Sequence, residues 1–303
     1  MAVTNTEVYR PFAGELRARR FRAWPLTQLS IRTGFKQKWP LFFFAPSYIA
    51  AVILSFIVYF KFVLESNEIT RVAPGAAAVA PMGGMVGKLI EVRSLFVEFN
   101  LAMSFFVLVV LGWYGSGLIA DDRRLSAHQL YFARPLSVLD YALAKFLALC
   151  FYGSFAFLVP CLIICTIAAF SSPEWSFVTK QGDVILDAVL FSTLSIAILA
   201  SIVLAISSLS TKKTFALAAT FGFFTMMQGI SALLAFLQRD RDFLMLSVLA
   251  NLRRVATEMF GHSQRFGARM DWDVGWSWLI LAGYAALAWT ILLRRVRRME
   301  ASV

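Results

Sequence analysis

Long apolar stretches alternate with short polar segments along this chain. Six stretches reach or approach the ~20 apolar residues that a helix needs to cross a bilayer. They are residues 41–63, 95–119, 141–169, 184–208, 215–237 and 275–293. A helix satisfies its own backbone hydrogen bonds in lipid, so each stretch is predicted to be helical. The pattern therefore predicts an all-α, polytopic membrane domain of six spans over residues 41–293.

Two further segments show helical spacing of apolar residues among basic ones. Residues 24–39 are predicted to form an amphipathic surface helix within an N-terminal segment, residues 1–40. Residues 243–260 are predicted to form a second surface helix before the sixth span. Residues 66–93 are rich in Ala, Gly and Pro and read as a loop, and residues 294–303 as a basic tail.

Composition places the chain in the membrane class independently of the pattern. Hydrophobic residues make up 59% of it and charged residues 16%, with a mean hydropathy of +0.69. An average soluble domain is about half apolar and a quarter charged. A chain with so few polar residues cannot cover a water-soluble globule, so we expect an integral membrane protein.

The net charge of +11 is carried mostly by short segments that flank the apolar stretches. Lys and Arg are enriched in cytoplasmic segments, and this rule places both termini inside (N-in/C-in), which agrees with an even number of spans. Anionic membrane lipids are the expected partners of these charges. Nucleic acid is not expected, because spans interrupt the basic segments.

No catalytic or metal-binding arrangement can be recognised. Cys150, Cys161 and Cys165 share one apolar stretch, where thiols pack as small apolar groups. The segment 83–89 resembles a phosphate-binding loop, but its glycine spacing is wrong, and Leu89 stands where the magnesium-binding hydroxyl is required. We therefore expect no ATP site, no metal and no cofactor on this chain, and no enzyme activity.

Few polar residues lie inside the predicted spans. Glu98 and Asn100 lie early in the second span and Gln228 lies in the fifth. An ionisable group at membrane depth suggests a functional site. Glu98, however, is close to the predicted outer interface, where a solvated carboxylate costs little, and this interpretation is favoured. For Gln228 an interhelical hydrogen bond is favoured over a substrate contact.

The loop between the second and third spans is the most informative segment. Residues 121–134 can form a short amphipathic helix, with Asp121 and Asp122 where acids favour a helix N-terminus. In this helix the apolar Leu125, Leu130 and Tyr131 alternate with the polar Arg123, Arg124 and Gln129. Such a helix could receive force from a soluble motor. The alternative is a basic inner loop that lipid headgroups stabilise.

The end of this loop is also predicted in detail. Pro135 stops the short helix, and Ser137 can cap the next one with Asp140 in its first turn. Arg134, which precedes the proline, and Lys145, which lies one to two turns into the next helix, complete the candidate set of coupling residues.

This loop resembles the first inner loop of ATP-binding-cassette (ABC) exporter permeases of the type-2 family. The matching residues are Ile119, Asp121 or Asp122, the pair Arg123 and Arg124, the run Arg134-Pro135-Leu136-Ser137, Tyr141 and Lys145. Members of that family have six spans, both termini inside and an amphipathic helix before the first span, all of which are predicted here. Many members carry a Gly-Thr-Leu-Glu-like stretch where this chain has residues 126–129.

The resemblance implies a permease whose energy comes from a partner. It implies two copies of an ABC ATPase subunit, which bind ATP and Mg, and a second permease copy or homologue. It also implies coupling to the ATPase through the loop residues, and a bacterial inner membrane fits such a chain. The alternatives are a mechanotransmitting membrane component driven by an ATPase, which a larger outer domain would favour, and an ATP-independent carrier or membrane enzyme.

Overall fold

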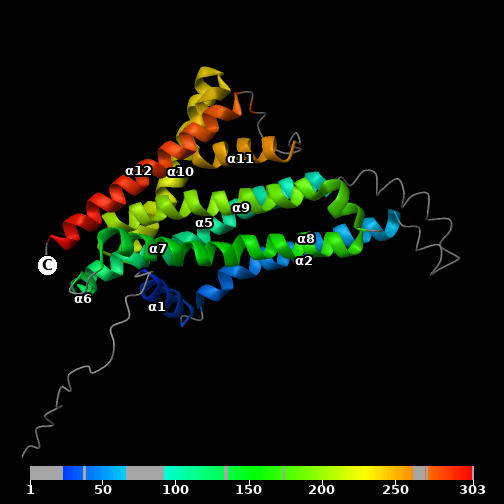
Figure 1. Ribbon diagram of the computed structural model, residues 1–303. Helices are drawn as coiled ribbons and strands as arrows, with labels where there is room; N and C mark the ends of the chain where they lie inside the picture. Colours follow the sequence, from blue (N-terminus) through cyan, green and yellow to red (C-terminus); the bar gives the residue numbers. More distant parts are fainter. Residues whose placement is uncertain are drawn as a thin grey trace, which may run out of the picture.

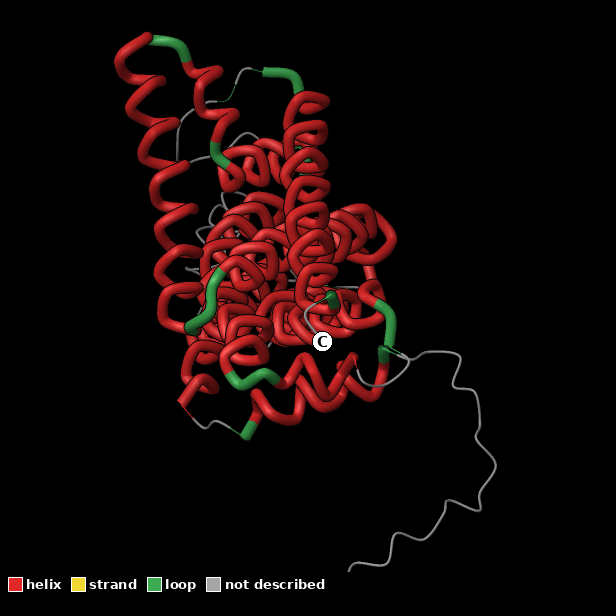
Figure 2. The backbone as a smooth tube through the Cα atoms, turned by 90° about the vertical axis from the view of Figure 1, so that its left-hand side faces the viewer, coloured by secondary structure: helices red, strands yellow, loops and turns green. Residues whose placement is uncertain are grey.

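The fold was analysed in a computed structural model of the chain. The structure describes residues 23–36, 39–65, 92–132, 136–172, 175–261, 270 and 272–301. Within these ranges the regular structure is helical and no strand is formed (Figures 1 and 2). Six helices are long and apolar enough to cross a membrane. For the described residues this agrees with the six spanning helices that the sequence predicts, as expected of an integral membrane protein.

Five of the six spanning helices are longer than the apolar stretches that predicted them, and the first, α2 (Ala45–Glu65), is slightly shorter than its stretch 41–63. The six are α2, α5 (Val92–Arg124), the continuous run of α7 (Val138–Gly153), η3 (Ser154–Leu158) and α8 (Val159–Ser171), α9 (Ser176–Leu209), α10 (Lys213–Gln238) and α12 (Val274–Glu300). Polar residues at the ends of an apolar stretch can continue its hydrogen-bonded backbone. The predicted basic tail is an example, because Arg294 to Arg298 lie in the last turns of α12.

The shorter elements lie near the ends of these helices. They are α1 (Trp24–Phe35), η1 (Trp39–Phe44), α6 (Ala127–Phe132), η5 (Arg241–Leu246) and α11 (Val248–Met259). The helix predicted over residues 243–260 is thus divided into η5 and α11. The division falls at Ser247, whose hydroxyl caps α11 by accepting a hydrogen bond of 3.3 Å from the Ala250 amide.

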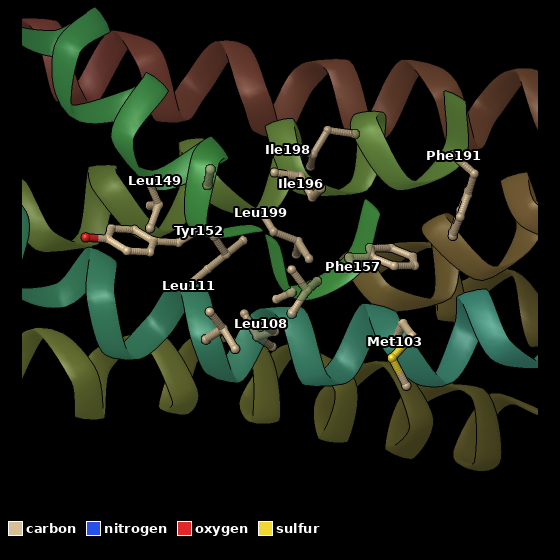
Figure 3. Close-up of a cluster of buried hydrophobic side chains, with 14 of the residues drawn as sticks. Met103, Leu108, Leu111, Leu149, Tyr152, Phe157, Phe191, Ile196, Ile198 and Leu199 are labelled. Atoms are coloured by element: carbon tan, nitrogen blue, oxygen red, sulfur yellow. The ribbon is translucent and has the colours of Figure 1, made fainter. Parts of the chain in front are cut away.

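The core is built by α5, α9 and α7. Of the most apolar part of each helix, 61% of α5 and 67% of α9 is buried within the chain, against 17% of α10 and 22% of α12. Figure 3 shows Leu108 and Leu111 of α5 facing the α9 residue Leu199. Close packing depends on small residues: a Cβ added at Gly115 would lie 2.6 Å from a Val203 methyl.

The remaining spanning helices pack on the outside of this core. α2 packs against α8, and α12 packs across α9. Figure 1 shows α10 and α12 leaning away from the layer of α5, α7 and α9. Their exposed sides carry large apolar residues such as Phe236 and Leu287, which suits contact with lipid.

Two ends of the bundle can be distinguished. The α6 end holds α6, the start of α10 and the C-terminal ends of α5 and α12 (left in Figure 1). There Arg123 donates hydrogen bonds of 2.8 Å and 3.0 Å to the carbonyls of Ser208 and Ser210. The α11 end holds η5 and α11. There Arg93, at the start of α5, pairs with Asp183 of α9 and donates to the Phe260 carbonyl.

The start that the sequence predicts for the helix over residues 121–134 is wrong. Asp121 and Asp122 lie in the last turn of α5, which runs to Arg124, and the separate helix α6 covers only Ala127–Phe132. The break comes at Ser126, whose φ of 54° is left-handed and cannot continue an α-helix. The predicted start of the next helix is confirmed, since Ser137 and Asp140 form a reciprocal capping box.

Candidate functional site

A buried ion pair joins the end of α5 to α7 at the α6 end. The Lys145 Nζ lies 2.8 Å from the Asp122 Oδ2, and their side chains are 4% and 15% exposed. Tyr141 donates a hydrogen bond of 2.7 Å to the same carboxylate oxygen. Buried charges are tolerated where they are paired and hydrogen-bonded. The pair therefore fixes the position of α7 relative to the segment that leads into α6.

The ring of Tyr131 brings α6 into this cluster. Lys145 Nζ lies 5.7 Å from the centre of the Tyr131 ring and 5.5 Å from that of Tyr141, at cation–π distance. Burial, and secondly the Asp122 carboxylate, raise the pKa of Tyr131. The neutral phenol is thus favoured, and α6 is held by ring contacts with the ion pair.

Helix α1 is attached to the same region of α7. The hydroxyl of Tyr152 donates a hydrogen bond of 2.7 Å to the Ile31 carbonyl, and Lys145 reaches the Ser30 hydroxyl at 3.5 Å. The Tyr152 ring stacks on Tyr114 of α5 with 4.1 Å between ring centres. Figure 3 shows the Tyr152 hydroxyl pointing away from the apolar cluster that packs its ring. Contacts to α1 and α5 therefore meet at one side chain of α7.

Two small residues allow α1 to approach α7 this closely. Thr27 donates to the Ala144 carbonyl at 3.2 Å. At Gly34, a Cβ would lie 2.0 Å from the Tyr152 Oη. The helix α1 thus lies on the bundle through a stripe of small residues, and not through its larger apolar ones alone.

A cleft of about 330 Å³ lies between α1 and this cluster, and we call it the α1 cleft. Five residues of the predicted coupling set line it: Asp121, Asp122, Arg124, Tyr131 and Lys145. The structure therefore brings together residues that the sequence places in one loop and in the following helix. It adds Ser30, Gly34 and Tyr152, which the sequence does not single out.

The other predicted coupling residues have different surroundings. Arg123 is directed to α9, as described above, and does not line the α1 cleft. Leu130 is 73% exposed on α6, and the neighbouring Leu125, which was not in the predicted set, is 68% exposed. Arg134 and Pro135 lie outside the described residues. At the α6 end the structure thus presents exposed leucines above a buried ionic cluster.

The three polar residues predicted to lie inside the spans also differ in their surroundings. Asn100 is fully buried and donates to the Phe96 carbonyl of its own helix at 2.8 Å. Gln228 accepts a hydrogen bond of 2.5 Å from Ser247, which links α10 to the start of α11 as the favoured interpretation expects. Glu98 and Gln228 both line a second cleft, of about 410 Å³, at the α11 end.

The packing of α1 against α7 was not predicted, although the sequence contains a signal for it. Thr27, Ser30 and Gly34 recur every three to four residues and therefore lie on one face of the helix. Small residues with this spacing favour close helix–helix contact. The sequence predicted a surface helix from its apolar and basic residues, and this second face explains why the helix packs on α7.

Comparison with known proteins gives no assignment. No protein family matches this chain, and no curated protein matches it.

Proposed function

We propose that this chain is the membrane-spanning permease subunit of an ABC exporter, driven by a separate ATPase subunit. One observation carries the proposal. A short helix, α6, exposes Leu130 at one end of the bundle, while the Asp122–Lys145 pair ties the end of α5, which leads into α6, to α7. An exposed apolar residue on a rigidly anchored helix suits docking to a protein.

The charge distribution supports an orientation with the α6 end in the cytoplasm. The ends of α5 and α12 and the start of α10 carry basic residues there: Arg123, Arg124, Lys212, Lys213, Arg294, Arg295, Arg297 and Arg298. Lys and Arg of this kind favour the cytoplasmic side. With both chain termini inside, α6 faces the compartment that contains ATP. A bacterial inner membrane is the proposed location.

The anchoring contacts provide a path for force. Movement of α6 by the ATPase would act on α7 through Asp122 and Lys145. It would act on α1 through the bonds from Lys145 and Tyr152 to Ser30 and Ile31. These three elements would then move as a unit relative to α10 and α12, which are less buried in the chain. ATP and Mg would bind to the ATPase subunit, in an assembly of two permeases and two ATPases.

The test is affinity purification of the tagged full-length chain from its native membrane, with identification of co-purifying proteins and an ATPase assay. An ABC ATPase at about equal amount is expected. Leu130→Asp should greatly reduce its recovery, because it places a charge on the docking surface. Leu246→Asp is the matched control, since Leu246 is an exposed leucine at the opposite end of the bundle.

The outcomes separate the proposal from its rivals. If no ATPase accompanies the wild-type chain from membranes where the complex survives solubilisation, an ATP-independent carrier or enzyme becomes the better account. If an ATPase binds and turns over but no substrate moves in reconstituted vesicles, the chain transmits force and does not transport. Equal recovery with Leu130→Asp would remove α6 from the docking surface.

A further inference from the structure

The cleft at the α11 end, which we call the α11 cleft, lies where α5, α10, η5 and α11 meet. Its volume is about 410 Å³, within the range of small-molecule sites in proteins. Most of its lining is apolar, including Leu101 and Phe105 of α5, Leu244 of η5, and Leu249 and Leu252 of α11. Such walls suit the hydrocarbon part of a ligand.

One carboxylate opens onto these apolar walls. Glu98 lies in the second turn of α5 and is partly buried. Within the described part of the chain, Glu98 has no ion pair or side-chain hydrogen bond. An acidic side chain inside a membrane helix is costly unless it is paired or solvated, and such residues commonly mark ligand pathways.

The other polar groups of the lining are already engaged. Gln228 accepts the hydrogen bond from Ser247, and the Ser104 hydroxyl donates to the Asn100 carbonyl at 2.8 Å. Arg253 also lines the cleft and makes an interaction of its own. Glu98 is therefore the lining group whose charge remains for a ligand to neutralise.

We infer that the α11 cleft binds an amphiphile that carries an ammonium group, with the ammonium at Glu98 and the hydrocarbon part along Leu101 and Phe105. A carboxylate in apolar surroundings attracts a cation more strongly than it would in water. This deepens the proposed function, on which it rests, by naming the class of substrate.

Binding can be measured on the permease alone, without its ATPase. The full chain is placed in nanodiscs of phosphatidylglycerol, and a fluorescent alkylammonium probe is titrated in. Saturable binding of the probe to the wild type is expected. The affinity of Glu98→Gln for the probe should be at least about tenfold lower, because this substitution keeps the side-chain shape and removes the charge. Glu258→Gln is the matched control, because this exposed acid of α11 pairs with Arg254 and does not line the cleft.

A second variant tests the apolar wall. Phe105→Ala should also weaken binding of the probe several-fold. Phe170→Ala should not, because Phe170 is an exposed phenylalanine of α8 that does not line the cleft. An alkyl sulfate of the same chain length should bind poorly to the wild type. Equal binding of both probes, or unchanged binding by Glu98→Gln, would overturn the inference.

Competition distinguishes the two natural sources of an ammonium amphiphile. If phosphatidylethanolamine in the nanodisc displaces the probe from the wild type, the ligand class includes an amino lipid. If only soluble alkylamines displace it, the ligand is a small hydrophobic amine. A loss of binding with Glu98→Gln supports the inference in either case, even if no ATPase is found and the exporter proposal fails.

Discussion

The hydroxyl of Tyr48 on α2 donates a hydrogen bond of 3.0 Å to the backbone carbonyl of Phe155 in the π-helical segment η3. In this segment the Val159 amide bonds to the Ser154 carbonyl, five residues back. The next donor in that pattern would be residue 160, which is a proline and has no N–H. Tyr48 thus replaces a backbone donor that the third span cannot supply itself.

We predict that Tyr48→Phe destabilises the fold, because it leaves the Phe155 carbonyl without its donor in an apolar environment. The expected loss is about 1 kcal/mol, or a fall of about 2 °C in the thermal unfolding midpoint measured in one detergent. Tyr59→Phe is the control, since it makes the same change at an exposed tyrosine of the same helix. Equal midpoints for the two variants would contradict the assigned role.

The Asp122–Lys145 pair is predicted to be more costly to break than to replace. Lys145→Met leaves a largely buried carboxylate without the Lys145 cation and should cost about 3 kcal/mol. Adding Asp122→Asn to Lys145→Met should recover a large part of this loss, because the uncompensated charge is then gone. A double-mutant cycle on the free energy of unfolding measures the coupling. Additive losses would show that the pair is not energetically coupled.

Gly34→Ala is predicted to displace α1 from α7. The new Cβ would lie 2.0 Å from the Tyr152 Oη, and therefore either α1 or the Tyr152 ring must shift. We expect this to lower the free energy of unfolding by about 1–3 kcal/mol. Limited trypsin digestion should then cut faster at Arg32 in α1. Gly222→Ala in α10 is the matched control, because its Cβ would meet nothing within 4 Å. Unchanged cleavage in Gly34→Ala would mean that α1 is not held by this contact.

In the proposed complex, Asp122→Asn should uncouple ATP hydrolysis from transport. The substitution weakens the link between α7 and the end of α5 that leads into α6, and it leaves the exposed surface of α6 unchanged. We expect a several-fold lower ratio of substrate moved to ATP hydrolysed in reconstituted vesicles. Asp121→Asn is the control, since Asp121 forms a looser and more exposed pair with Arg124, at 3.7 Å. If both variants keep the wild-type ratio, force does not pass through Asp122.

Features that depend on the chain's local chemistry were predictable. The six spans follow from apolar length, because lipid leaves a backbone segment little choice other than a helix. The capping of α7 by Ser137 and Asp140 follows from residue types three positions apart. The end of α5 at Arg124 was not predicted, since it depends on a left-handed Ser126, a residue type without a strong preference for that conformation.

The sequence by itself determined the membrane class, the number of spans and the loop that contains the candidate coupling residues. Only the tertiary structure decided which of them meet: that Asp122 pairs with Lys145, that Tyr152 holds α1, and that Glu98 opens onto a cleft formed by four elements. The reason is physical. Hydropathy and capping act between near neighbours in the chain, whereas these contacts depend on how helices far apart in the sequence pack against one another.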